Sequence, residues 1–133
     1  MTSHSPATFF ASPERLPRDA VVQQHQSVVA SEIVPQLLEC FPGPAALIND
    51  QRQIVLANRE LEKLSGLPHR DLLGLRFGES LSCVNAHELP AGCGTAPACA
   101  LCGAACAIES SQRTGEADAE DCRITIERNH QKD

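Results

Sequence analysis

The sequence predicts a mixed α+β domain, and three observations support this prediction. Two short apolar segments, residues 45–48 and 54–57, are separated by the polar residues 49–53, which is the pattern of a β-hairpin. Apolar residues recur at helical spacing on both sides of this hairpin. Residues 122–127 alternate between apolar and polar side chains, as expected for a half-buried strand.

The composition limits the chain to one domain with a flanking segment. Its 133 residues include 42% apolar residues, and no run of 18 apolar residues could span a membrane. The net charge of −6 and the four Phe, with no Trp or Tyr, argue against a nucleic-acid partner. No export signal is recognisable, which predicts a cytoplasmic, reducing location. In that setting, clustered cysteines favour metal or thiol chemistry over structural disulfides, unless the true N-terminus is missing.

The N-terminal part divides into two segments. Residues 1–18 are polar and aperiodic, which predicts a disordered leader. Residues 19–33 form an amphipathic helix that Asp19 could cap, and Pro35 interrupts the apolar stripe that continues to residue 39. Two interpretations of this helix stay open: a homodimer contact, or a helix packed on its own domain.

The hairpin leads into short helices. Asn58 is a good N-cap for a helix over residues 59–65, and Gly66 ends that helix. Residues 69–74 add one more helical turn, which closes at Gly74.

The stretch LLECFPGPAALINDQRQIVLANRELEKLSGLPHRDLLGLRF resembles a PAS domain over about residues 31–80. The likeness lies in the hairpin that ends in Ala57-Asn58, the short leucine-bearing helix, and the phrase from Gly66 to Gly74. The resemblance implies an antiparallel sheet with helices on one face, a sensory role for residues 34–133, and a histidine kinase or transcription regulator as the output. It also implies five strands. Only three candidates are present, so either the domain is truncated before its last two strands or another chain completes the sheet.

The cysteine-rich segment, residues 83–106, predicts a four-thiolate site. Nine, five and two residues separate Cys83, Cys93, Cys99 and Cys102, and glycines lie around them. The same run resembles a cysteine-bearing subgroup of bacterial sensory PAS domains. A helix over residues 98–111, capped by Thr95, would place Cys99, Cys102 and Cys106 on one face.

Several occupants of this site stay open. Four thiolates suit zinc, whereas the uneven spacing also suits an iron–sulfur cluster, and a thiol-based switch or simple packing needs no metal. His87 and Cys106 are possible extra ligands. Cys40 and Cys122 are expected to be ordinary core residues.

The predicted function is non-enzymatic. No oxyanion-hole or substrate-pocket pattern accompanies the cysteines and His87. The chain is expected to be a sensory PAS domain that relays a redox or ligand signal to an output partner, as a homodimer through residues 19–39. The alternative is an interaction module that zinc merely braces.

Overall fold

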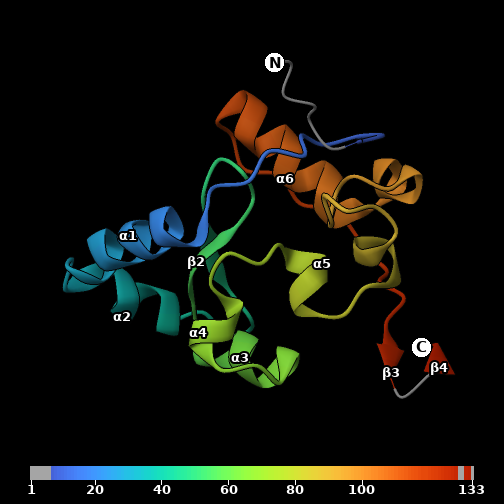
Figure 1. Ribbon diagram of the computed structural model, residues 1–133. Coiled ribbons are helices and arrows are strands. Elements are labelled where there is room, and N and C mark those ends of the chain that lie inside the picture. The colour runs from blue at the N-terminus through green and yellow to red at the C-terminus, as the bar shows by residue number, and fades with distance from the viewer. Residues whose placement is uncertain (1–6, 129–130, 133) are drawn as a thin grey trace. The chain divides into compact units, whose positions relative to one another are not determined.

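The computed structural model describes residues 7–128, 131 and 132 (Figure 1). Helices and strands are mixed, as the predicted α+β class requires. The chain divides into two compact units. The hairpin unit is Arg15–Ser80, and the cysteine unit combines the residues up to Glu14 with those from Leu81 onward. This division differs from the sequence-based boundaries at residues 18 and 33.

The predicted hairpin is confirmed. Strand β1, Ala46–Ile48, pairs antiparallel with β2, Ile54–Ala57, and an irregularity in the register follows Leu47. In the turn, the Asn49 side-chain oxygen accepts hydrogen bonds of 2.9 Å from the backbone N–H groups of Gln51 and Gln53. A short polar side chain that bonds to its own turn in this way stabilises a tight connection.

Asn58 is the predicted N-cap, and the structure gives it a wider role. Its Oδ1 accepts from the N–H of Leu61 in α3, Arg59–Ser65, and from the N–H of Ala45, both at 3.0 Å. Its Nδ2 donates to the carbonyl oxygens of Leu38 and Gly43. This buried amide therefore holds one helix start, one helix end and the turn between them. Gly66 ends α3 in the left-handed conformation, with φ of 73°, as predicted.

The N-terminal helical region forms two helices, α1, Arg18–Val29, and α2, Ile33–Glu39. The predicted cap by Asp19 is wrong, because Pro17 occupies the N-cap position and Asp19 lies in the first turn. The break precedes Pro35, which then sits in the first turn of α2, where its missing N–H costs little.

Two apolar clusters form the core of the hairpin unit. In one, Val21 of α1 packs with Val55 and Leu73. In the other, Leu61 and Leu72 pack with the apolar residues of β2. Leu72 belongs to α4, His69–Leu72, and the unit ends with α5, Phe77–Ser80. Strand β2 is buried along its whole length and is thus the centre of this core.

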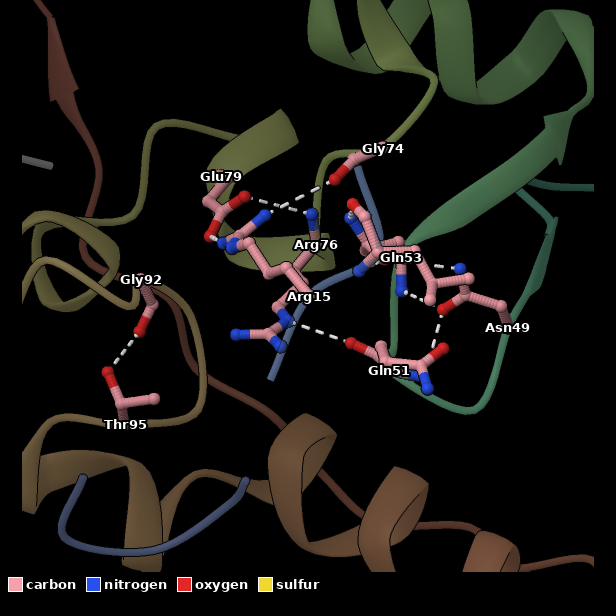
Figure 2. A network of polar contacts seen from close by, with 10 residues as sticks. Arg15, Asn49, Gln51, Gln53, Gly74, Arg76, Glu79, Gly92 and Thr95 are labelled. Carbon is pink, nitrogen blue, oxygen red and sulfur yellow. Dashed lines mark hydrogen bonds and ion pairs between the residues drawn. The ribbon is translucent and has the colours of Figure 1, made fainter. Parts of the chain in front are cut away.

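A buried arginine links the hairpin turn to α5 (Figure 2). The Arg76 residue is 1% exposed, and its Nε donates to the Gln51 carbonyl oxygen at 2.9 Å. Its backbone N–H donates to Glu79 at 3.0 Å, and Glu79 also forms an ion pair with Arg15. A guanidinium group removed from water in this way must keep its hydrogen-bond partners.

Two histidines face each other beside β2. The rings of His25 and His69 lie 5.0 Å apart, between their centroids. His25 Nδ1 donates to the Val55 carbonyl oxygen at 2.8 Å, whereas His69 Nε2 accepts from the Ala57 N–H at 3.1 Å. Burial, and then the neighbouring His25, lower the pKa of His69 from its ordinary value, against the opposing effect of Glu62 and Glu39.

We expect the hairpin unit to lose stability as the pH falls below about 6.5. There the unfolded chain protonates His69, while the lowered pKa keeps the folded histidine neutral as the acceptor for Ala57. His69→Gln keeps an acceptor but cannot titrate, so its stability should depend less on pH in this range. Urea denaturation followed by circular dichroism at pH 7.5 and 5.5 measures the difference. Identical pH dependence in the two proteins would contradict the assignment.

The cysteine unit contains the 3₁₀ helices η1, Val84–His87, and η2, Pro97–Leu101, then α6, Gly103–Thr114, and the strands β3, Glu127–Arg128, and β4, Gln131–Lys132. The predicted strand over residues 122–127 is wrong, because within it only Ile126 and Glu127 have strand-type pairing. Ile126 makes an isolated bridge with Cys83, and β3 pairs with β4 instead of joining the β1–β2 sheet.

Part of the predicted disordered leader makes defined contacts in this unit. The N–H of Phe9 donates to the Thr95 carbonyl oxygen at 2.8 Å, and the N–H of Ala11 donates to that of Gly94 at 2.9 Å. Ala11 is buried. Residues 1–6 of that leader lie outside the described residues. In the part of the chain that the structure describes, no helix is both long and apolar enough to cross a membrane.

Candidate functional site in the cysteine-rich segment

The helix predicted over residues 98–111 is broken at Cys102. Ala96, not Thr95, is the N-cap of η2, and the Thr95 hydroxyl donates instead to the Gly92 carbonyl oxygen at 2.6 Å (Figure 2). Cys102 is extended, with φ of −78° and ψ of 123°, and serves as the N-cap of α6. The predicted common face of Cys99, Cys102 and Cys106 is therefore wrong, because these residues do not belong to one continuous helix.

The four predicted ligands lie in different surroundings. Cys99 is 5% exposed and packs with Ala96 and Ala105. Cys83 is partly buried and pairs with the backbone at Ile126. Cys93 is partly buried between Gly92 and Gly94, whose φ values of 89° and 92° only glycine adopts readily.

The two additional candidates also differ. His87, at the end of η1, is exposed. Cys106 is partly buried, and its Sγ lies 3.3 Å from the Ala100 carbonyl oxygen.

Among residues 7–128, 131 and 132, no three His, Cys, Asp or Glu side chains are grouped so that they could hold a metal ion. The side chains as arranged thus do not fit a closed metal site, and the four-cysteine site stays a prediction.

The structure brings together one pair of thiols that the sequence did not suggest. The Sγ atoms of Cys102 and Cys122 lie 3.6 Å apart. Cys122 was expected in the core, but it is exposed, as is Cys40. The expectation for Cys122 depended on the strand over residues 122–127, which does not form at that position. At 3.6 Å the two sulfurs are in van der Waals contact, and this distance is much longer than the S–S bond of a disulfide, about 2.05 Å.

Gly103 permits this contact by leaving room for the chain after Asp121. A Cβ atom at position 103 would lie 2.7 Å from the carbonyl carbon of Asp121 and 3.3 Å from the Cα of Cys122. Both are backbone atoms, so they cannot move aside as a side chain could. A glycine directly after Cys102 is the one sequence signal that could have indicated a close backbone approach.

The start of α6 also affects the Cys122 thiol. Burial raises the pKa of this thiol, a hydrogen bond with the backbone of Ala104 lowers it, and the neighbouring Cys102 and Cys83 thiols raise it. The net effect is a raised pKa. Cys102 is the N-cap residue of α6, but its side chain makes no capping hydrogen bond to the helix. The first backbone N–H groups of α6 are therefore not capped by Cys102, and the Cys122 sulfur lies close to them.

Gly103→Ala is expected to weaken the packing of residues 121–122 against α6 by about 1–3 kcal/mol, because overpacking against backbone forces a shift. The higher helix propensity of alanine offsets part of this cost. Gly43→Ala is the matched control, since no atom lies within 4 Å of its added Cβ. Hydrogen exchange at the first amides of α6 should accelerate in Gly103→Ala alone. Equal exchange in both variants would show that the close approach is unimportant.

Comparisons with known proteins found no relative. No protein-family model, no curated protein and no solved structure matches this chain. The function must therefore be inferred from the residues and from their arrangement.

Proposed function

We propose that the chain is a PAS-like sensory domain whose cysteine unit receives a thiol-directed signal and relays it to a histidine kinase or transcription regulator. The stretch that resembles a PAS domain, residues 31–80, falls within the hairpin unit. It contains the hairpin, the Asn58 cap and the Gly66 turn on which the resemblance depends. These observations support a sensory role, and no chemistry is assigned to the hairpin unit.

The observation that carries the proposal is the contact between the Cys102 and Cys122 sulfurs at 3.6 Å. The contact joins the start of α6 to a segment 20 residues further along the chain, and Cys83 is near enough to affect the Cys122 thiol. Two neighbouring thiols, one of them exposed, can be joined by an oxidant or bridged by a soft metal ion. A reaction there would change how residues 121–128 are held, which is a structural output.

The proposal favours thiol chemistry over a bound cofactor. The predicted cofactor, zinc or an iron–sulfur cluster, would be held by Cys83, Cys93, Cys99 and Cys102. Holding either group would require these thiols to converge, with Cys99 leaving its apolar packing. The contact of Cys102 with Cys122 favours thiol chemistry instead. The proposal also includes a homodimer through residues 19–39, which the exposed side chains of Ile33 and Leu37 support.

Two measurements on the full chain, purified without oxygen, test the proposed function. Elemental analysis with a visible spectrum should show a colourless protein with less than one metal per chain. Hydrogen exchange in the hairpin unit should then change when the thiols are oxidised. One tightly held zinc per chain, with no response of the hairpin unit to oxidation, would contradict the sensory role and favour the alternative, an interaction module braced by zinc. A visible band that oxygen bleaches would assign an iron–sulfur cluster.

A further inference from the structure

We propose that Cys102 and Cys122 form a reversible disulfide with a low-molecular-weight disulfide as the oxidant. The bond would tie the segment after α6 to the start of that helix. Its role as a signal rests on the proposed function, whereas its formation depends on local geometry alone.

The backbone already holds the two sulfurs close together. Their separation of 3.6 Å must fall to about 2.05 Å in the bond, which small side-chain rotations can achieve when the backbones are near. The backbones are near because the Asp121–Cys122 peptide passes directly over Gly103, the neighbour of Cys102. The backbone of Ala104, in the first turn of α6, is also close enough to influence the Cys122 sulfur.

The pair is also accessible to a small reagent. Cys122 is exposed and Cys102 is partly buried. Cys99, the nearest cysteine in sequence, is instead buried in the apolar cluster with Ala96 and Ala105. The Cys106 sulfur lies beside the Ala100 carbonyl oxygen. Among these thiols, the structure assigns the bond to Cys102 and Cys122.

The reaction is a two-step thiol–disulfide exchange. The Cys102 sulfur attacks one sulfur of the small disulfide, a mixed disulfide forms, and one small thiol leaves with the Cys102 proton. The Cys122 sulfur then attacks the Cys102 sulfur of the mixed disulfide. The second small thiol leaves with the Cys122 proton, so the protein is oxidised by two electrons and the reagent is reduced to two thiols.

The test equilibrates the full chain in buffers of reduced and oxidised glutathione, blocks free thiols with N-ethylmaleimide, and maps the bond in a non-reduced tryptic digest. Trypsin separates Cys122, in peptide 114–123, from the cysteines of peptide 77–113. We expect these two peptides to be linked, and fragmentation should place the link at Cys102. Reduction should separate them again.

Cys102→Ser should abolish the link, whereas Cys106→Ser, a matched control on the adjacent helix α6, should retain it. If Cys102→Ser does not fold, the position of the link in the unaltered chain still decides the question. Peptide 114–123 linked through another cysteine, or carrying only glutathione, would overturn the inference. A link at Cys102 with no change of hydrogen exchange in the hairpin unit would leave the disulfide established and refute the proposed signalling role.

Discussion

Replacing Arg76 by methionine is expected to lower the free energy of unfolding by about 3 kcal/mol. Arg76 is 1% exposed, and its Nε donates to the Gln51 carbonyl oxygen. Methionine can fill the volume of the aliphatic stem but supplies no donor. The Gln51 carbonyl group would lose this hydrogen bond inside the protein.

Arg70→Met is the matched control for this prediction. The Arg70 side chain is 83% exposed and lies 3.9 Å from Asp71, so its loss should change stability by less than about 0.5 kcal/mol. The chain has no Trp or Tyr, so urea denaturation is best followed by far-ultraviolet circular dichroism, with hydrogen exchange at β2 to locate the effect. Equal losses in the two variants would mean that the buried guanidinium contributes no more than an exposed one.

Oxidation to the Cys102–Cys122 disulfide is expected to raise the free energy of unfolding of the cysteine unit by about 3 kcal/mol. The bond would close a loop spanning 20 residues, and the closed loop reduces the conformational entropy of the unfolded chain. The near-contact of the sulfurs means that little native structure must be distorted to form the bond.

The measurement compares urea unfolding of the reduced and oxidised protein, monitored by hydrogen exchange at the amides of α6. Cys102→Ser, which cannot form the bond, should unfold identically under both conditions. A gain of similar size in Cys102→Ser would assign the stabilisation to a different pair of thiols. A loss of stability in the unaltered chain would show that the disulfide strains the helix start.

Local chemistry explains what the sequence could predict. A polar turn between two apolar segments fixes a hairpin without reference to the rest of the chain. Asn58 and Gly66 act within a few residues of themselves, through a side-chain cap and a left-handed turn. The existence of β1, β2 and α3 therefore followed from short segments. The PAS-like arrangement of a complete sheet depends on long-range pairing, and it stays a prediction.

The errors occurred where distant segments decide the outcome. The helix through the cysteines breaks at Cys102, which is extended, and Asp121 passes over Gly103. Gly103 is the only local signal of that approach, and it does not indicate which distant segment makes it. The alternating residues 122–127 satisfy a strand pattern, but the backbone around Cys122 packs on a helix start instead of a strand. The burial of Arg76 could not be predicted from the sequence either, because the Gln51 carbonyl oxygen that accepts its hydrogen bond lies in a turn 25 residues earlier.

The contacts of Phe9 and Ala11 with Thr95 and Gly94 have a consequence for the order of folding. They make the cysteine unit discontinuous, with the whole hairpin unit lying between its two parts in the chain. During synthesis the hairpin unit emerges complete, so it can fold first, because domains generally fold as units. The N-terminal residues must then wait for the cysteine-rich segment before they find their partners. The cysteine-rich segment consequently depends on backbone contacts with residues that are synthesised well before it and with residues that follow it.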